Sequence, residues 1–459
     1  MNNQNKTQSA VIKTIKKLTP NILTALVATA LGLLSLYTSP VPMIQDFGKM
    51  LSIGMGVSFV FALIILIPIL FVRDRFFPIE KKKTKTKRNN KFESVMKKIT
   101  NFTLKFKYVI FIFAIVIAGV GVFLDQLVGV ETDIETFMPQ DTQELLDIQE
   151  LRRIIGTTEQ LSIVYSSDDI FTDNNIAWIE DVTNNLMIEF PTEIVSVNSI
   201  TGVLNQITTN PLNSVSANQL IENLPEEQLK MLINSDLTKG VIIIQIEDLS
   251  TEELTAFITN INDYLVSTNS DMDVTVTGQA VIDLEMMTSL TTGRYTITLI
   301  GMALVFIGLL IIYRDPLKAI IPLIPITLIV GWSGGVMYLF DMKYTPLTAT
   351  LGALIIGIGT EFTILIMGRY YEEKAKTKDN NEAIKNTLGK MGKPIIASAL
   401  TTIGGFSALV ISDFEILSNF GIMTLVNITF ALLSTIFIMP IVLSIQYTIV
   451  NKFKKNKAI

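Results

Sequence analysis

The chain alternates long apolar stretches with polar segments, and eight apolar stretches are long enough to cross a membrane. They lie near 20–38, 47–72, 108–124, 294–313, 317–340, 345–368, 394–412 and 418–446. A helix needs about 20 apolar residues to cross a hydrocarbon core about 30 Å thick. Pro40 and Pro42 separate the first two stretches because proline interrupts a helix. The pattern predicts a polytopic α-helical membrane protein with about eight transmembrane helices, in agreement with a mean hydropathy of +0.47.

One long polar block, 125–293, interrupts this pattern. Short β-rich runs predict strands, and amphipathic runs between them predict helices. The strands are expected at 160–166, 193–200, 240–248 and 273–278, the helices at 174–190 and 250–267, and a helical region with polar turns at 214–235. The first of these helices places four apolar side chains on one face, Ile176, Ile179, Val182 and Leu186. Ser250 and Glu253 have the spacing of a capping box. The order of elements predicts an extracytoplasmic α+β domain with a split, ferredoxin-like fold.

Charge predicts the orientation in the membrane. Segment 73–107 has 13 basic and 3 acidic residues, whereas 125–293 has 29 acidic and 4 basic residues. Basic loops stay on the cytoplasmic side, so we expect a multi-pass protein of the cell membrane with both termini in the cytoplasm. The predicted organisation is a cytoplasmic N-terminus with two transmembrane helices (1–72), a basic cytoplasmic linker (73–107), a transmembrane helix (108–124), the extracytoplasmic domain (125–293), a five-helix membrane domain (294–446) and a basic cytoplasmic tail (447–459). The basic run 81–91 is suited to contact anionic membrane lipids.

The first two apolar stretches resemble the last two at an offset near 373. Matching positions are Pro20 with Pro394, Thr29 with Thr402, Gly32 with Gly405, and Phe47-Gly48 with Phe420-Gly421. If 108–446 is one complete repeat, the other is represented only by its last two helices. We therefore expect either a partner that supplies the missing N-terminal half or a homo-oligomer.

One charged residue, Glu361, lies deep inside an apolar stretch. A carboxylate at the centre of a membrane helix costs roughly 2.5 to 3.5 kcal/mol, so it usually faces protein or water and marks an ion or proton pathway. It lies about eight residues, or roughly 12 Å, before Arg369. Ala349, Ala353 and Gly357 precede it at steps of four, which predicts close packing on another helix. Glu361 is our candidate for a proton relay.

Several polar side chains are candidates to support Glu361 by hydrogen bonds. They are Thr360, Thr401, Thr402 and Asn427, together with Thr350 and Thr363. The alternative is a structural role, in which these groups hold Glu361 permanently protonated. The chain has no cysteine and no histidine, which excludes thiolate chemistry and removes the commonest metal ligand. It also has no Walker loop and no arrangement of a nucleophile with a base, so we expect no enzyme, cofactor, metal or nucleic-acid function.

Five stretches resemble the resistance-nodulation-division (RND) superfamily of transporters. They are VETDIETFMPQDTQELLDIQELRRIIG, VTVTGQAVIDLEM, IIYRDPLKAIIPLIPI, GIGTEFTILIMGRYYEE and ASALTTIGGFSALVIS. The resemblance is greatest to MmpL-type and archaeal hydrophobe/amphiphile exporters. It implies a porter-type external domain, a five-helix bundle of the RND and sterol-sensing type, and a chain that lacks about the first four helices and first external domain.

The same resemblance implies proton-driven export, or efflux by proton antiport, of hydrophobic, amphiphilic or lipid-like molecules. Gly357 and Glu361 take the positions of the family's GxxxD-Y-type motif, with Glu in place of Asp and Phe362 in place of Tyr. This departure removes the phenol from any relay and leaves the carboxylate able to exchange a proton. Two alternatives have the same one-plus-five helix plan: a protein-export accessory resembling SecD and SecF, and a lipid- or sterol-sensing membrane protein.

Overall fold

The computed structural model describes residues 20, 22–76, 91–131, 139, 142–147, 150, 159–208, 211–247, 249–268 and 270–456. The chain divides into two compact units. The helical unit comprises residues 1–138 and 289–459, and the α+β unit comprises residues 139–288. The predicted lipid-binding run lies outside the described residues except for Lys91.

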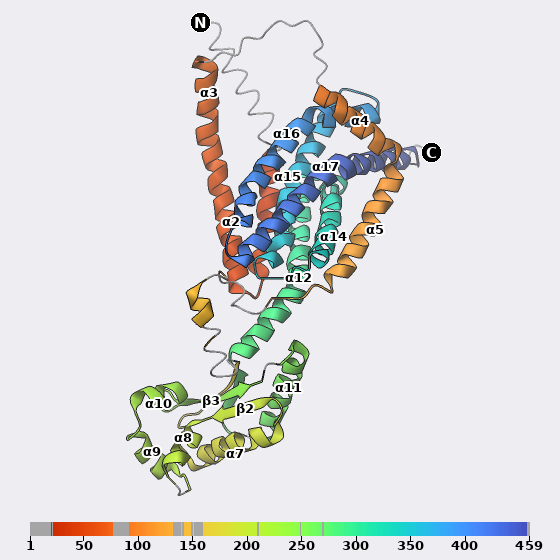
Figure 1. Ribbon diagram of the computed structural model, residues 1–459. Coiled ribbons are helices and arrows are strands. Elements are labelled where there is room, and N and C mark those ends of the chain that lie inside the picture. Colours follow the sequence, from red (N-terminus) through yellow and green to blue (C-terminus); the bar gives the residue numbers. More distant parts are fainter. Residues whose placement is uncertain are drawn as a thin grey trace. The chain divides into compact units, whose positions relative to one another are not determined.

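The helical unit confirms the predicted class of polytopic helical protein (Figure 1). Its elements are the apolar helix Ile22–Thr38, which ends in η1 (Ser35–Thr38), then α2 (Pro42–Phe61), the π-helical turn η2 (Ala62–Leu66), α3 (Ile67–Phe76), α4 (Lys91–Lys105), α5 (Lys107–Asp125), α12 (Gln279–Tyr313, which begins in the α+β unit), α13 (Pro316–Ile320), α14 (Leu323–Leu339), η4 (Thr348–Thr350), α15 (Leu351–Lys374), α16 (Asn380–Val410) and α17 (Glu415–Asn456). Within the described residues, six helices are long and apolar enough to span a membrane, and they match the last six predicted stretches. The first two predicted stretches are also helical.

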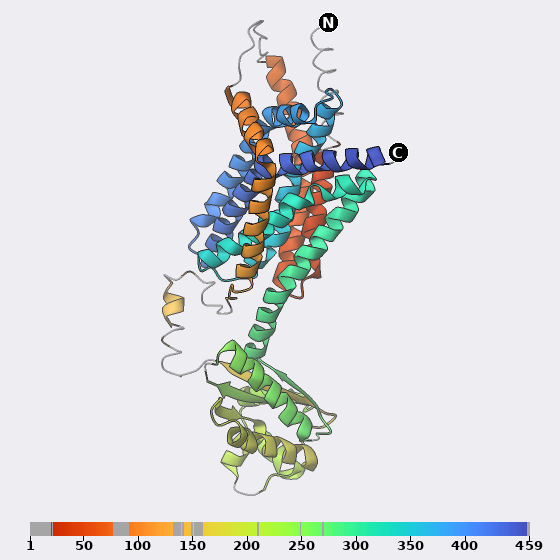
Figure 2. The same cartoon turned by 90° about the vertical axis from the view of Figure 1, so that its right-hand side faces the viewer.

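Helices α14, α15 and α17 pack together in the interior of the helical unit, and small residues allow α5 to approach α14 closely. A Cβ atom added at Gly331 would lie 2.5 Å from the carbonyl oxygen of Ala118, and one added at Gly335 would lie 3.1 Å from the Cα of Gly121. The two backbones therefore touch without intervening side chains, as small residues permit in membrane helices. Helix α17 contains Pro440, and its C-terminal part turns across the end of the bundle where α4 packs (Figure 2).

Helix α4 was not predicted, because its residues belong to the segment that the charge pattern marks as a linker. It buries Met96, Thr100 and Thr103. The side chain of Met96 lies over Gly392 of α16, where an added Cβ would come within 2.9 Å of its sulfur. Packing against α16 therefore stabilises part of this basic segment as an amphipathic helix.

The α+β unit confirms the predicted ferredoxin-like fold. Its elements are β1 (Gln160–Ser166), α7 (Asp173–Glu189), β2 (Ile194–Asn198), α8 (Ile200–Ile207), α9 (Ser214–Ile221), α10 (Glu226–Leu232), β3 (Lys239–Ile246), α11 (Thr251–Ser267) and β4 (Asp273–Thr277). The four strands form an antiparallel sheet in the order β2-β3-β1-β4. Alternate residues of β1 and β3 enter one apolar cluster with α7 and α11, so these helices cover one face of the sheet. The four predicted apolar residues of α7 are all buried, and Ser250 and Glu253 form the predicted capping box.

Candidate functional site

Glu361 lies in the middle of α15, where its own side chain is exposed. Its neighbours Thr360 and Phe362 are buried, whereas Glu361 itself is exposed. Among the described residues, it makes no hydrogen bond and no ion pair. The helix therefore presents a carboxylate at mid-span without a neutralising partner.

The predicted supporting hydroxyls donate to backbone carbonyls of their own helices. Thr360 donates to Gly357 (2.8 Å), Thr401 to Ala397 (2.9 Å) and Thr402 to Ser398 (3.0 Å). The other two follow the same rule: Thr350 donates to Leu347 and Thr363 to Gly359. In the described part of the chain, none of them donates to Glu361. The described contacts therefore contain no hydrogen bond from these threonines to Glu361, and their supporting role stays a prediction.

Asn427 differs from these threonines. It is 4% exposed on α17, and neither its amide nitrogen nor its amide oxygen has a partner among the described residues. An unsatisfied buried amide costs roughly 1 to 3 kcal/mol, so such a group usually has a functional role or binds a water molecule or an ion. Its predicted role beside Glu361 also stays a prediction.

Helix Ile22–Thr38 packs on α15 about one turn before Glu361. The hydroxyl of Thr29 donates to the carbonyl oxygen of Gly357 at 3.0 Å, and a Cβ added at Gly32 would lie 3.0 Å from Cγ2 of Ile356. Glu361 follows Gly357 by four residues, which places it on nearly the same side of α15. The small-residue stripe is therefore used for close helix packing, as the sequence predicts.

A second polar cluster, which we call the Asp125 cluster, comprises Asp125, Arg294, Tyr295 and Tyr344. The guanidinium of Arg294 lies 3.2 Å from a carboxylate oxygen of Asp125 and donates to its backbone carbonyl at 2.9 Å. The phenol of Tyr344 donates to the other carboxylate oxygen at 2.5 Å, and Tyr295 also donates to the carboxylate. The guanidinium carbon also lies 3.7 Å from the ring centre of Tyr344. Asp125, Arg294 and Tyr344 are each at most 7% exposed.

The Asp125 cluster joins the C-terminus of α5, helix α12 and the segment after α14. Gly334 of α14 makes room for it, because a Cβ there would lie 2.5 Å from the Asp125 side chain. The sequence pattern does not indicate this cluster, since Asp125 and Arg294 stand at the ends of apolar stretches and resemble ordinary flanking charges. The available signal was two opposite charges that both border the polar block at its junctions with the membrane helices.

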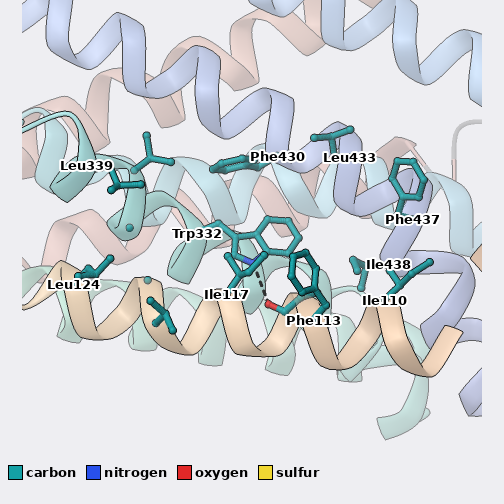
Figure 3. A pocket seen from close by; sticks show the side chains of 15 residues that line it. Ile110, Phe113, Ile117, Leu124, Trp332, Leu339, Phe430, Leu433, Phe437 and Ile438 are labelled. Carbon is teal, nitrogen blue, oxygen red and sulfur yellow. Dashed lines mark hydrogen bonds between the residues drawn. The ribbon is translucent and has the colours of Figure 1, made fainter. Parts of the chain in front are cut away.

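An open apolar hollow of about 400 Å³ lies between α5, α14 and α17 (Figure 3). It is lined by Ile110, Phe113, Ala114, Ile117, Val120, Gly121, Leu124, Trp332, Gly335, Val336, Leu339, Phe430, Leu433, Phe437 and Ile438. The indole nitrogen of Trp332 donates to the carbonyl oxygen of Ala114 at 3.1 Å, and its ring meets Phe430 edge to face. The one polar group of the indole is thus satisfied, and the hollow offers an apolar ligand a surface without an unpaired donor.

The likeness to known proteins agrees with this architecture. The MMPL family matches residues 193–457, more than half of the chain. A membrane protein of Methanocaldococcus jannaschii is 26% identical over 77% of this chain and 94% of its own length. The "probable transport protein MmpL8" of Mycobacterium bovis is 26% identical over 30% of this chain, which spans only 13% of that relative.

Two solved structures share the fold. The hedgehog release protein Disp of the water bear Hypsibius dujardini superposes with a TM-score of 0.70 and 13% identity, over 94% of this chain and 59% of its own. SecDF of Thermus thermophilus superposes with a TM-score of 0.52 and 14% identity, over 96% of this chain and 50% of its own. The chain thus spans about half the length of both. Taken with the family match and the helical and α+β units, these findings show that the chain belongs to the MMPL family of RND-type membrane proteins.

Proposed function

We propose that the protein is a subunit of a proton-driven transporter for hydrophobic, amphiphilic or lipid-like molecules. The observation that carries this proposal is the exposed carboxylate of Glu361 in the middle of α15, which has no hydrogen-bond or ion-pair partner among the described residues. Family membership and the MmpL relative's name support transport in general. Glu361 supports the more specific proposal that the proton gradient drives this transport.

Protonation of Glu361 changes what α15 can pack against. An ionised carboxylate at mid-membrane requires water or a cation beside it, whereas the neutral acid tolerates an apolar neighbour at much lower cost. Phe362, which stands where the family motif has tyrosine, is buried and brings no hydroxyl group. Glu361 therefore acts without a phenol at this position, and its protonation favours a different helix arrangement from its ionisation.

Helix α15 connects Glu361 to the apolar hollow. It packs against both α14 and α17, which carry the hollow's two facing aromatic residues, Trp332 and Phe430. Asn427 precedes Phe430 by about one turn of α17. A shift of α15 against these helices is therefore positioned to alter the hollow, which would hold an apolar chain.

We place the protein in the cell membrane with the basic end of the helical unit in the cytoplasm. The residues at this end include Lys374, Lys390 and Lys98, and the α+β unit is strongly acidic. The positive-inside rule supports this orientation. The α+β unit would then lie outside the cytoplasm.

Proton flux in liposomes tests the proposal. Purified protein is reconstituted with an entrapped pH-sensitive dye, and a pH step is imposed across the membrane. Glu361→Gln, which keeps the size of the side chain and removes its proton exchange, should abolish protein-dependent flux. Glu415→Gln, at the exposed start of α17, is the matched control and should retain it. Equal flux from Glu361→Gln and the unmodified protein would refute a relay at this residue.

The substrate class is tested separately by photolabelling. A phospholipid with a diazirine at the end of one acyl chain should label peptides that contain Trp332 or Phe430. Val336→Trp fills the hollow from its half-buried wall and should reduce this labelling. Labelling that is unchanged by Val336→Trp would show that the lipid contacts the outer surface of these helices without entering the hollow.

A protein-export accessory is the second candidate, because the fold is similar to that of SecDF. The likeness at 14% identity shows the fold alone. Co-purification with the protein translocon would favour this candidate. A lipid sensor, in contrast, would bind lipid in the photolabelling experiment and conduct no protons.

A further inference from the structure

The Asp125 cluster uses only one part of the Arg294 guanidinium. Its Nη2 atom donates to the carbonyl oxygen of Asp125 at 2.9 Å and to the hydroxyl of Tyr295 at 3.2 Å, and it lies 3.2 Å from the Asp125 carboxylate. The Nε and Nη1 atoms, which carry three further N–H groups, have no hydrogen-bond partner among the described residues. Because Arg294 is only 6% exposed, bulk water does not solvate these groups. Buried charged donors of this kind require an acceptor.

Two aromatic rings hold the guanidinium in this position. Its carbon lies 3.7 Å from the ring centre of Tyr344 and 4.7 Å from that of Tyr295. Both phenols donate to Asp125, which fixes the two rings in turn. A ring face attracts the cation as a whole, but it does not replace the oxygen acceptors that a buried guanidinium requires. The free N–H groups therefore belong to a side chain that is fixed in place.

A small pocket of about 40 Å³ lies against the Arg294 side chain. Apart from the Asp125 cluster, the polar side chains that line it are Thr298 of α12, Ser333 of α14 and Thr348 of η4. The hydroxyl of Thr298 donates to the carbonyl oxygen of Arg294, so its own oxygen is still able to accept. Thr348 is bonded to Thr345 within its own turn. Thr298 and Ser333 therefore provide the hydroxyl groups that a ligand in this pocket would meet.

The volume of the pocket limits the size of this ligand. One buried water molecule needs at least about 10 to 15 Å³ of such space, so about three water molecules fit in 40 Å³. The headgroup of a lipid is much larger than this. The apolar hollow between α5, α14 and α17, at about 400 Å³, has the size for an acyl chain. The pocket beside Arg294 therefore suits only a very small molecule or ion.

The charge of the Asp125 cluster decides between water and a small anion. The carboxylate of Asp125 already balances the charge of Arg294. A bound anion would add an uncompensated negative charge to a buried site, which is costly. The ligand must therefore be neutral, and it must accept from Arg294 and donate to the hydroxyl oxygens. Water has both capacities.

We propose that this pocket is a structural water site. About three water molecules accept hydrogen bonds from Nε and Nη1 of Arg294 and donate to Thr298 and Ser333. These waters complete the Asp125 cluster, because they satisfy the donors that the protein leaves free. The inference goes beyond the proposed function, since it concerns hydration at the outer ends of α5 and α12 and holds whether or not Glu361 transfers protons.

Radiolytic labelling tests the proposal in the full chain in detergent micelles. A brief X-ray pulse splits water into hydroxyl radicals, which oxidise nearby methionine side chains, and mass spectrometry measures the oxidation. Met337 lines the pocket and is 1% exposed, whereas Met439 is 0% exposed and does not line it. Bound water should oxidise Met337 at least about fivefold faster than Met439. Equal rates for the two methionines would overturn the water site.

Ser333→Val is the variant that should displace the water. It replaces a hydroxyl group in the pocket wall with an apolar side chain, so oxidation of Met337 should fall to the rate of Met439. An unchanged rate at Met337 would overturn the proposal. If Met439 oxidation rises as well, the variant has unfolded. The comparison then uses Thr298→Val, which keeps the shape of the side chain and should also lower the rate at Met337.

A cycle with Arg294→Met separates lost hydration from steric strain. Ser333→Val should lower the detergent unfolding midpoint of the unmodified protein, because Arg294 is then left with unpaired donors. In the Arg294→Met background these donors are gone, so the same change should have little effect. An equal loss in both backgrounds would identify strain as the cause and overturn the water site.

Replacement of gluconate by chloride at constant ionic strength tests for an anion. The unfolding midpoint should not respond, because water is the occupant. A midpoint that rises with chloride in the unmodified protein and not in Arg294→Met would identify an anion and overturn the proposal. Oxidation and unfolding are measured without a proton gradient, so failure here is distinguishable from failure of the proposed function.

Discussion

The Asp125 cluster allows a quantitative prediction about buried charge. Asp125 and Arg294 form an ion pair at 3.2 Å with 7% and 6% of each residue exposed. Removing one member of such a pair leaves the other charge buried, which costs about 3 to 5 kcal/mol. The two residues have different remaining partners, so the two single variants should differ in stability.

Asp125→Asn is expected to be the more damaging change, at about 3 to 5 kcal/mol, because Arg294 then keeps its charge and loses its only carboxylate among the described residues. Arg294→Met leaves Asp125 with hydrogen bonds from two phenols, Tyr295 and Tyr344. Hydrogen bonds to a charged group are worth about 1.5 to 3 kcal/mol each, so this variant should lose only about 2 to 3 kcal/mol. The double variant removes both charges and should lose at least about 2 kcal/mol less than the sum of the single variants.

The assay is the free energy of unfolding in mixed micelles, obtained by titration with a denaturing detergent for the four members of the cycle. Lys97→Met, which breaks a half-exposed pair with Glu93, is the control and should lose less than about 1 kcal/mol. Additive losses in the double variant would refute the coupling. A greater loss for Arg294→Met than for Asp125→Asn would refute the role given to the two tyrosines.

Three further predictions concern packing and titration. Gly331→Leu should lower the stability of the full chain by about 1 to 3 kcal/mol or more, because the side chain would collide with the Ala118 carbonyl; an unchanged detergent unfolding midpoint would contradict this packing. In the isolated α+β unit, burial raises the pKa of Tyr165, so its stability should fall as pH rises above about 10, where the unfolded chain ionises first. Tyr165→Phe should reduce this alkaline loss, and Tyr264, whose pKa burial also raises, should account for a smaller remainder. Urea unfolding at two pH values measures the loss, and an identical loss in both proteins would exclude Tyr165 as a cause. Hydrogen bonds from Ser250 lower the pKa of Glu253, so Ser250→Ala should raise that pKa toward its ordinary value in an NMR titration, and an unshifted curve would contradict the capping box.

Local pattern was sufficient to predict most elements of the fold. The strand at 160–166 and the capped helix that begins at Thr251 follow from alternation and from the Ser250–Glu253 spacing, and both agree with the structure. The membrane helices follow from length and hydropathy alone. Helix α4 could not be predicted in this way, because its order depends on contacts with Gly389 and Gly392 of α16, nearly 300 residues further along the chain.

The sequence by itself determined the class of the protein, the order of its helices and strands, and the position of Glu361 at mid-span. These properties depend on hydrogen bonds and hydrophobic periods within one segment. Only the tertiary structure decided which side chains meet. It joined Asp125 to Arg294 and Tyr344 across 169 and 219 residues, and it left Glu361 exposed on α15. The physical reason is that side-chain contacts depend on how separate helices pack, and a local pattern of residues does not contain that information.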